Sequence, residues 1–169
     1  NIKVLDELGL NKEKDFVFLR FVSWGAFHDI GEKGVSKEDK IKIVKKISKT
    51  VQVVISSEGD LPEELKEYEL SISPEKIHDV LAFAKLYIGE GGTMASECAM
   101  LGVPSIYINS LPLMGYLREA ENVGLLYHLQ ELDDIINTID KILSLNSKHF
   151  KENKKKLLDN TIDPTALLV

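Results

Sequence analysis

The residues best suited to chemistry lie between positions 89 and 97, where an apolar run gives way to Glu90, two glycines and a series of small side chains. The pattern predicts a strand, a turn and a helix whose first free backbone N–H groups belong to Gly92, Thr93 and Met94. Free N–H groups and the positive end of a helix dipole attract phosphate, and glycine lets an anion approach the main chain. The segment is therefore a candidate phosphate site.

The glycine turn has no standard phosphate-binding fingerprint. Gly91 and Gly92 lack the fixed glycine spacing of dinucleotide-binding proteins, and no Gly-Lys-Ser/Thr follows them as it would in a P-loop. A tight turn that needs only small residues is an equally simple interpretation. Glu97 comes one turn later among small side chains. Its carboxylate is either a solvent-exposed group or an acceptor for sugar hydroxyl groups.

Candidate catalytic groups lie close to this turn in the expected fold. His28 and Asp29, in the polar segment that follows the apolar run 16–22, could form an acid/base pair, and Glu90 is a third candidate. Together with His78 these groups could also ligate a metal ion, since imidazole and carboxylate suit zinc or manganese. Their spacing does not favour a metal site, and we expect none.

Alternating short apolar runs and amphipathic segments must position these residues. Strands are predicted over 16–22, 51–56, 68–72, 86–89, 104–109 and 125–127, and helices over 37–48, 74–84, 94–101, 116–122, 132–143 and 147–159. This alternation implies right-handed βαβ crossovers and an α/β, Rossmann-like, doubly wound parallel sheet of about six strands flanked by helices. Ligands of such sheets bind beyond the carboxyl ends of the strands. We therefore expect a single edge to carry Ser23, Glu58, Ser73, Gly91 and Asn109.

Composition narrows the class of protein. The chain has 169 residues, of which 44% are apolar and 28% charged, which suits one globular domain. A single cysteine, Cys98, excludes an internal disulfide, and no apolar run approaches the roughly 18 residues of a membrane span. The net charge of −6 argues against a broad nucleic-acid surface. We expect a cytoplasmic protein with no transmembrane segment and no nucleic-acid partner.

The run from Phe83 to Ser105 resembles the donor-binding segment of GT-B glycosyltransferases, where a strand, a glycine pair, a helix bearing Glu and a Gly-x-Pro strand hold a nucleotide-sugar. With the runs 23–29 and 73–79 included, the chain is closer still to an uncharacterised bacterial and archaeal group. That group is similar to the lipid II N-acetylglucosaminyltransferase and the UDP-N-acetylglucosamine 2-epimerase. The resemblance covers about residues 15–145. It implies the C-terminal, donor-binding half of a GT-B fold.

The resemblance also implies how the chain is divided. Residues 1–14 would be a linker or helix from a missing N-terminal domain, 15–145 the nucleotide-sugar-binding domain, and 146–169 a C-terminal helix and tail that pack toward the missing domain. The chain begins at Asn1 without an initiator Met, which we interpret as a piece of a longer polypeptide. The missing domain would then be a partner within the same polypeptide.

The resemblance implies contacts with each part of a UDP-sugar donor. These contacts are the ribose at Glu97, the diphosphate at Gly91, Gly92, Thr93 and Met94, a second phosphate contact at Ser23 and Gly25, and the uracil edge at the main chain near Ile77. Arg118 could meet a phosphate or a sugar carboxylate, or lie on a helix surface. We expect Gly92→Val to block the diphosphate by filling the anion's space. No cofactor besides the donor is expected, and the fragment should bind without turnover.

Two alternative functions remain open. The first is a UDP-N-acetylglucosamine 2-epimerase-like isomerase, although such proteins carry a His-Arg pair where this chain has Ser23 and Trp24. The second is a non-enzymatic interaction domain with a doubly wound fold. A receiver-like domain of that kind needs a lone Asp and a Lys after two of its strands, where this chain has Ser73 and Asn109. Glycosyl transfer is therefore the favoured interpretation.

Overall fold

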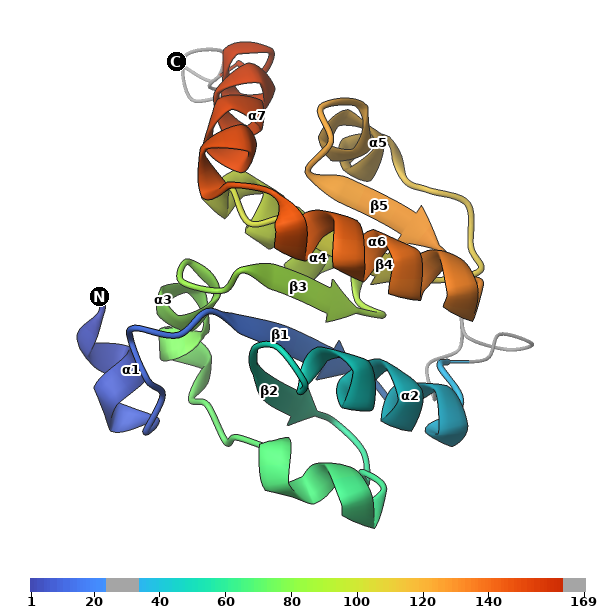
Figure 1. Cartoon of the computed structure of the whole chain (residues 1–169). Helices are drawn as coiled ribbons and strands as arrows, with labels where there is room; N and C mark the ends of the chain where they lie inside the picture. Colours follow the sequence, from blue (N-terminus) through green and yellow to red (C-terminus); the bar gives the residue numbers. More distant parts are fainter. Residues whose placement is uncertain (24–33, 163–169) are drawn as a thin grey trace.

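Five parallel strands form a single sheet in a computed structural model that describes residues 1–23 and 34–162 (Figure 1). The strand order is β2-β1-β3-β4-β5. The strands are β1 (Phe16–Phe21), β2 (Gln52–Ser57), β3 (Leu86–Gly89), β4 (Ser105–Ile108) and β5 (Leu126–Leu129). All four neighbouring pairs are parallel. The sheet class expected from the sequence is confirmed, with five strands in place of about six.

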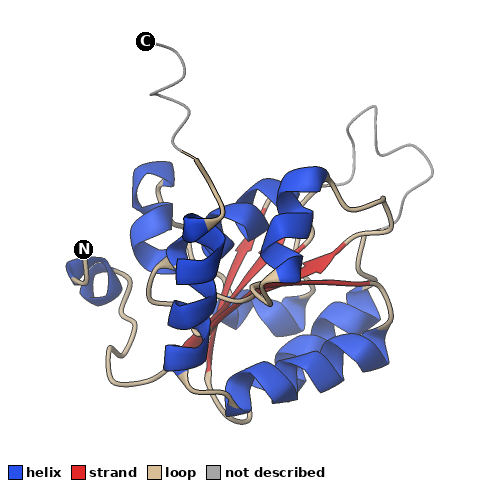
Figure 2. Cartoon of the chain, turned by 90° about the horizontal axis from the view of Figure 1, so that it is seen from above, coloured by secondary structure: helices blue, strands red, loops and turns tan. Residues whose placement is uncertain are grey.

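Helices cover both faces of the sheet, which lies between them when seen from above (Figure 2). One face carries α2 (Lys37–Ile47) and α6 (Leu132–Ser144), and the other carries α3 (Ile77–Leu81), α4 (Gly92–Leu101) and α5 (Gly115–Asn122) (Figure 1). Short 3₁₀ helices, η2 (Glu63–Tyr68) and η3 (Pro74–Lys76), lie between β2 and α3. The chain is therefore wound in both directions from β1, as a doubly wound fold requires.

The core is centred on β1 and β3, which are neighbouring interior strands of the sheet. Every residue of β3 is buried, and so is every residue of β1 except the half-buried Arg20. Strands covered by helices on both faces read as continuous apolar runs, which is why both were visible in the sequence. The rings of Phe18 and Tyr87 stack across the two strands with centroids 6.4 Å apart.

Local signals set two of the helix boundaries that matter for the site. Ser36 caps α2, because its hydroxyl oxygen accepts the backbone N–H of Asp39 at 3.1 Å. Gly102 ends α4 in the left-handed conformation with φ 83°. A Cβ there would also come within 2.9 Å of the Lys154 side chain, but the positive φ alone favours glycine.

The predicted strand over 68–72 is wrong. Tyr68 belongs to η2, and the extended segment that follows makes one isolated parallel bridge, between Glu69 and Ile55 of β2, with the Leu70 N–H donating to Ile55 at 2.9 Å. Glu69 and Ser71 are exposed, so only alternate residues pack on the core. The segment occupies the edge position beside β2 but is too short to form a ladder.

The two ends of the described chain pack on the helix layer that contains α3 and α4. α1 (Lys3–Glu7) buries Val4 and Leu5 and contacts α3, while α7 (Ser147–Asp159) buries Phe150 and Leu157 and contacts α4. Whether these ends belong to a larger assembly stays a prediction. No helix in the described ranges is long and apolar enough to cross a membrane.

Candidate functional site

The carboxyl ends of β1 and β3 lie side by side, and the chain leaves these two strands toward opposite edges of the sheet. The register pairs Arg20 with Gly89, so the residues that follow the two strands lie next to each other. From β1 the chain crosses to β2 on one side, and from β3 it crosses to β4 on the other. In open α/β sheets, ligands bind in the crevice at such a switch point. The glycine turn expected from the sequence begins here.

The helix α4 begins at this crevice. Gly91 is the N-cap, and no side chain in the described part of the chain caps the helix. The first turn, which contains Gly92, Thr93 and Met94, has no acidic residue. The amide groups of that turn are the ones an α-helix leaves unpaired, and the helix dipole places partial positive charge there. The arrangement is suited to an anion.

The two glycines of the turn have different reasons for being small. A Cβ on Gly92 would lie 3.2 Å from Leu117 and 3.5 Å from the Tyr116 hydroxyl, so this glycine permits α4 to pack against α5. Among the described residues, a Cβ on Gly91 would meet only Val22, at 3.8 Å, and its φ of −96° suits any residue. The steric argument made from the sequence for Gly92 therefore applies to Gly91, where the packing of the described residues gives no reason for glycine.

Glu90 is a buried brace between three segments. Its side chain is 3% exposed, and its two carboxylate oxygens accept the backbone N–H of Val22 at 3.1 Å and of Val35 at 2.6 Å. Val22 follows β1 and Val35 precedes α2, so one carboxylate fixes both chain segments against the glycine turn. Glu90 was a catalytic candidate in the sequence. Its geometry indicates a positioning role.

Ser23 takes part in a second brace at the same edge. Its N–H and its hydroxyl donate to one oxygen of Glu58, at 3.1 and 3.4 Å, and Arg20 donates to the other oxygen at 2.7 Å. The Ser23 backbone N–H, followed by Arg20, holds the pKa of the Glu58 carboxyl below its usual value. Ser23 and Glu58 therefore come together as expected, while the Ser23 amide is already occupied.

Glu97 faces His78 across the contact between α4 and α3. Their side chains are 37% and 58% exposed, and the Nε2 and Oε2 atoms lie 3.4 Å apart. Ile77, the residue before this histidine, is partly buried, and its N–H already donates to the Pro74 carbonyl. The structure thus brings the ribose and uracil candidates to neighbouring helices. A base edge would have to use main-chain groups near Ile77 other than that N–H.

Asn109, at the end of β4, joins the glycine turn to β5. Its side-chain amide donates to the Glu90 carbonyl at 3.4 Å, and its own carbonyl accepts the Nε2–H of His128 at 2.7 Å. The His128 ring stacks on Tyr107 with centroids 5.3 Å apart. Arg118 instead lies exposed on α5, where its guanidinium contacts the Leu113 carbonyl at 3.5 Å.

Three site predictions, Gly25, His28 and Asp29, lie outside the described residues. Within the described ranges, no three His, Cys, Asp or Glu side chains gather as a metal site would require. Arg20 and His128 also belong to this edge and were not predicted from the sequence. A single arginine inside an apolar strand was the available signal for Arg20, since a buried guanidinium needs a partner.

The comparisons with known proteins show the family and the fold of this chain. The family model described as "Protein of unknown function (DUF354)" matches residues 1–169. The chain belongs to this family. A relative in Methanocaldococcus jannaschii, the uncharacterized protein MJ0665, is 28% identical over 107 residues, which are 59% of this chain and 30% of that protein.

Solved structures with this fold include glycosyltransferases and an epimerase. The UDP-GlcNAc 2-epimerase from Neisseria meningitidis, solved with UDP-GlcNAc, matches 90% of the chain with a TM-score of 0.62 and 13% identity. The spinosyn rhamnosyltransferase SpnG matches 92% with a TM-score of 0.59 and 17% identity. The wall teichoic acid polymerase TagF matches 94% with a TM-score of 0.59 and 12% identity.

The matches cover only part of each of these proteins. The chain spans 42% of the epimerase structure, 44% of SpnG and 41% of TagF. At such identities the likeness shows the fold. The expected Rossmann-like half of a GT-B fold is therefore confirmed, and its ligand and activity are matters for proposal.

Proposed function

We propose that this domain is the donor-binding half of a glycosyltransferase and that it holds the diphosphate of a nucleotide-sugar, with UDP as the nucleotide. The observation that carries the proposal is the N-terminus of α4, which no described side chain caps, at the switch point between β1 and β3. No acidic residue opposes an anion in its first turn, and among the described residues only Val22 lies within 4 Å of the place a Cβ on Gly91 would take.

The nucleoside would lie along α3 and α4. Glu97 is one and a half turns after Gly92 on α4, and its exposed carboxylate can accept both hydroxyls of a ribose. The partly buried Ile77 offers an apolar surface for a flat base beside it. The diphosphate and ribose contacts would thus come from one helix, which fixes the distance between them.

In the transfer step, the domain would stabilise the leaving nucleotide. Negative charge grows on the diphosphate as the glycosyl bond breaks, and the N–H groups of Gly92, Thr93 and Met94 are oriented before the reaction begins. Glu90 and Asn109 hold the turn in place from behind. The acceptor and its base would be supplied from outside this chain, so the chain alone should bind and not turn over.

Calorimetric titration of the chain with UDP and with uridine tests the proposal. UDP should bind more tightly than uridine, and Gly91→Val should remove this preference while uridine affinity stays unchanged. Gly59→Val is the matched control, because no described residue lies within 4 Å of a Cβ there. A folded Gly91→Val variant that keeps the wild-type preference for UDP would show that the diphosphate does not bind at this turn.

A further inference from the structure

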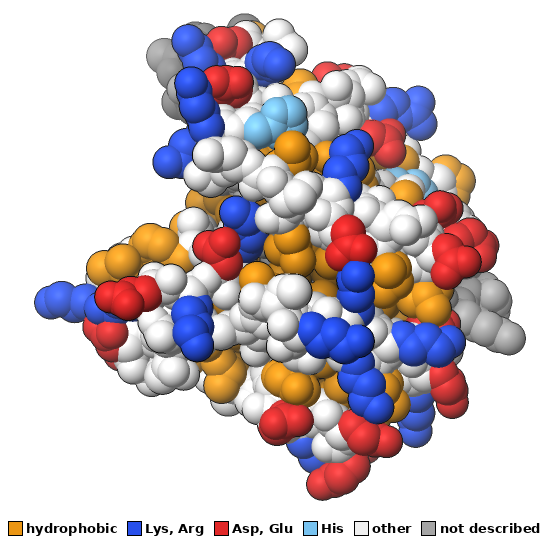
Figure 3. Space-filling view, viewed as in Figure 1, with side chains coloured by type: hydrophobic (Ala, Val, Ile, Leu, Met, Phe, Trp, Pro, Cys, Tyr) orange, Lys and Arg blue, Asp and Glu red, His pale blue; other side chains and the backbone are white. Residues whose placement is uncertain are grey.

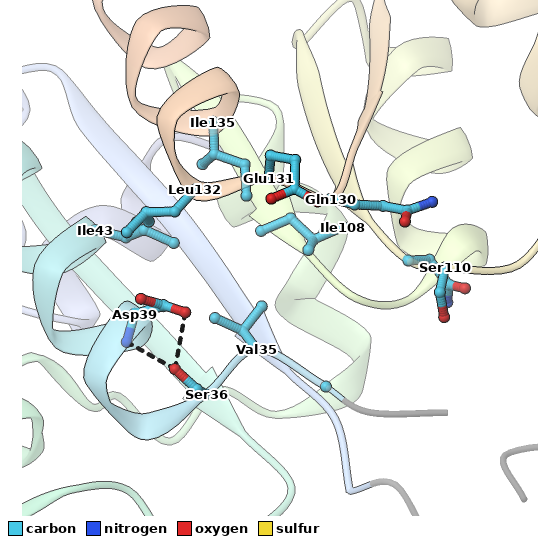
Figure 4. A pocket seen from close by; sticks show the side chains of 12 residues that line it. Val35, Ser36, Asp39, Ile43, Ile108, Ser110, Gln130, Glu131, Leu132 and Ile135 are labelled. Carbon is cyan, nitrogen blue, oxygen red and sulfur yellow. Dashed lines mark hydrogen bonds between the residues drawn. The ribbon is translucent and has the colours of Figure 1, made fainter. Parts of the chain in front are cut away.

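A concave site lies on the face of the sheet opposite α4. A pocket of about 330 Å³ opens between the start of α2 and the start of α6, at the carboxyl ends of β4 and β5 (Figure 4). The volume is within the range of small-molecule sites. Its floor is aliphatic and consists of Val35, Ile43, Ile108, Leu132 and Ile135. In the space-filling view, apolar side chains reach the surface between these two helices (Figure 3).

The charged side chains among the described lining residues of this pocket are both carboxylates. Carboxylates of Asp39, from α2, and Glu131, from the start of α6, lie on either side of the aliphatic side chains (Figure 4). None of the described lining residues is a lysine or an arginine. Within the described ranges, no cation lies at ion-pair distance from Glu131, whereas Asp39 pairs with Lys42 at 3.0 Å. The pocket therefore carries negative charge over an apolar floor.

Asp39 stays ionised in this setting. Lys42, followed by the Ser36 hydroxyl, lowers the pKa of the Asp39 carboxyl, and the Ser36 hydroxyl donates to it at 2.8 Å. Both contacts leave lone pairs on a carboxylate that can accept from a ligand. An anionic ligand such as a diphosphate would meet like charge here, so this pocket is unsuited to the donor.

We infer that the pocket binds a small ligand with a branched aliphatic body and an ammonium group, the body on the isoleucine and valine floor and the ammonium between Asp39 and Glu131. A hydroxyl head would be a weaker substitute, because it donates one hydrogen bond and carries no charge. A carboxylate head would be repelled. The inference does not depend on nucleotide binding at α4.

The pocket is connected to the glycine turn by two contacts. Val35 lines the pocket and donates its N–H to Glu90, and Asn109 lines the pocket and donates to the Glu90 carbonyl. An amine held here would therefore lie next to two residues that bond directly to Glu90. The two sites are on opposite faces of the sheet, so an amine and UDP would bind at the same time.

Three probes with one aliphatic body test the inference. 3-Methylbutylamine, 3-methylbutan-1-ol and 3-methylbutanoate are titrated into the chain without nucleotide, and the δ-methyl signals of labelled Ile43, Ile108 and Ile135 are followed by NMR. We expect affinity in the order amine, alcohol, carboxylate, with the amine about tenfold tighter than the carboxylate. Methyl signals that do not move with the amine, or equal affinity for amine and carboxylate, would overturn the inference.

Variants locate the ammonium group. Glu131→Gln should weaken the amine about tenfold and leave the alcohol nearly unchanged. Asp134→Asn is the matched control, since it removes the same charge from the exposed first turn of α6 without lining the pocket. Equal weakening by the two variants would mean that general charge, and not the pocket, attracts the amine.

Discussion

Replacement by Gln should have different effects at the two carboxylates of the α4 region. At Glu90 it should lower stability, and at Glu97 it should lower UDP affinity. Glu90→Gln replaces an oxygen that accepts an N–H with an amide group that cannot accept it, so one of the two bonds, to Val22 or Val35, is lost at a site that is 3% exposed. Hydrogen bonds to charged groups contribute about 1.5 to 3 kcal/mol, and an unpaired buried donor adds to the loss. We expect a destabilisation of about 3 kcal/mol.

Glu97→Gln is the comparison within the same protein. Its carboxylate is 37% exposed and pairs with an even more exposed histidine, so the loss of stability should be about 0.5 kcal/mol or less. UDP affinity should instead fall about tenfold or more, because a charge-assisted bond to ribose becomes a neutral one.

Urea unfolding measures stability, and titration at a temperature where both variants are folded measures affinity. In thermal unfolding, Glu90→Gln should lower the midpoint by about 6 to 12 °C. A Glu90→Gln variant as stable as the wild type would refute the bracing role. Undiminished UDP affinity in Glu97→Gln would refute the ribose role.

Three further predictions concern buried or paired groups. Tyr87→Phe should raise stability by about 1 kcal/mol in urea unfolding, because the buried Tyr87 hydroxyl has no hydrogen-bond partner in the described structure, and a loss of stability would contradict this. The buried Cys98 thiol, whose pKa is raised by burial, should react with a thiol reagent only as fast as the chain unfolds. The pKa of Glu58 is lowered by the Ser23 N–H and by Arg20, so its contribution to stability is present above its usual pKa near 4.5 and is lost as pH falls through the folded pKa. Glu58→Gln should accordingly lose less stability than the wild type between about pH 5 and pH 3.

The sequence predicted the elements whose signals are local. The run Leu86–Gly89 matches β3, and the helix over 147–159 matches α7. A continuous apolar run and a 3.6-residue period can both be recognised from the sequence alone. The segment over 68–72 failed because its alternation of apolar and polar residues resembles a strand. Whether the segment pairs with β2 depends on how many of its residues are free to extend along that edge, and Tyr68 is part of η2 instead.

Some features of the candidate site follow from local sequence pattern, and others depend on contacts between distant residues. The glycine turn and the free N–H groups of α4 follow from short-range pattern, so they were predictable. The braces around Glu90 and Glu58 join residues 35 to 68 positions apart and depend on strand register, which one sequence does not reveal. The sequence did not reveal that a Cβ on Gly92 would point toward Leu117, because that contact depends on how α5 packs against α4.

The position of the diphosphate is the central claim, and a UDP titration followed through backbone amide shifts tests it most directly. With ¹⁵N-labelled chain, the largest changes should occur at the N–H groups of Gly92, Thr93 and Met94, with smaller ones near Glu97 and His78. The N–H groups of the α4 turn should shift less with uridine than with UDP. Shifts that cluster elsewhere, for example at Val35 and Leu132, while the α4 turn stays unperturbed would contradict the account.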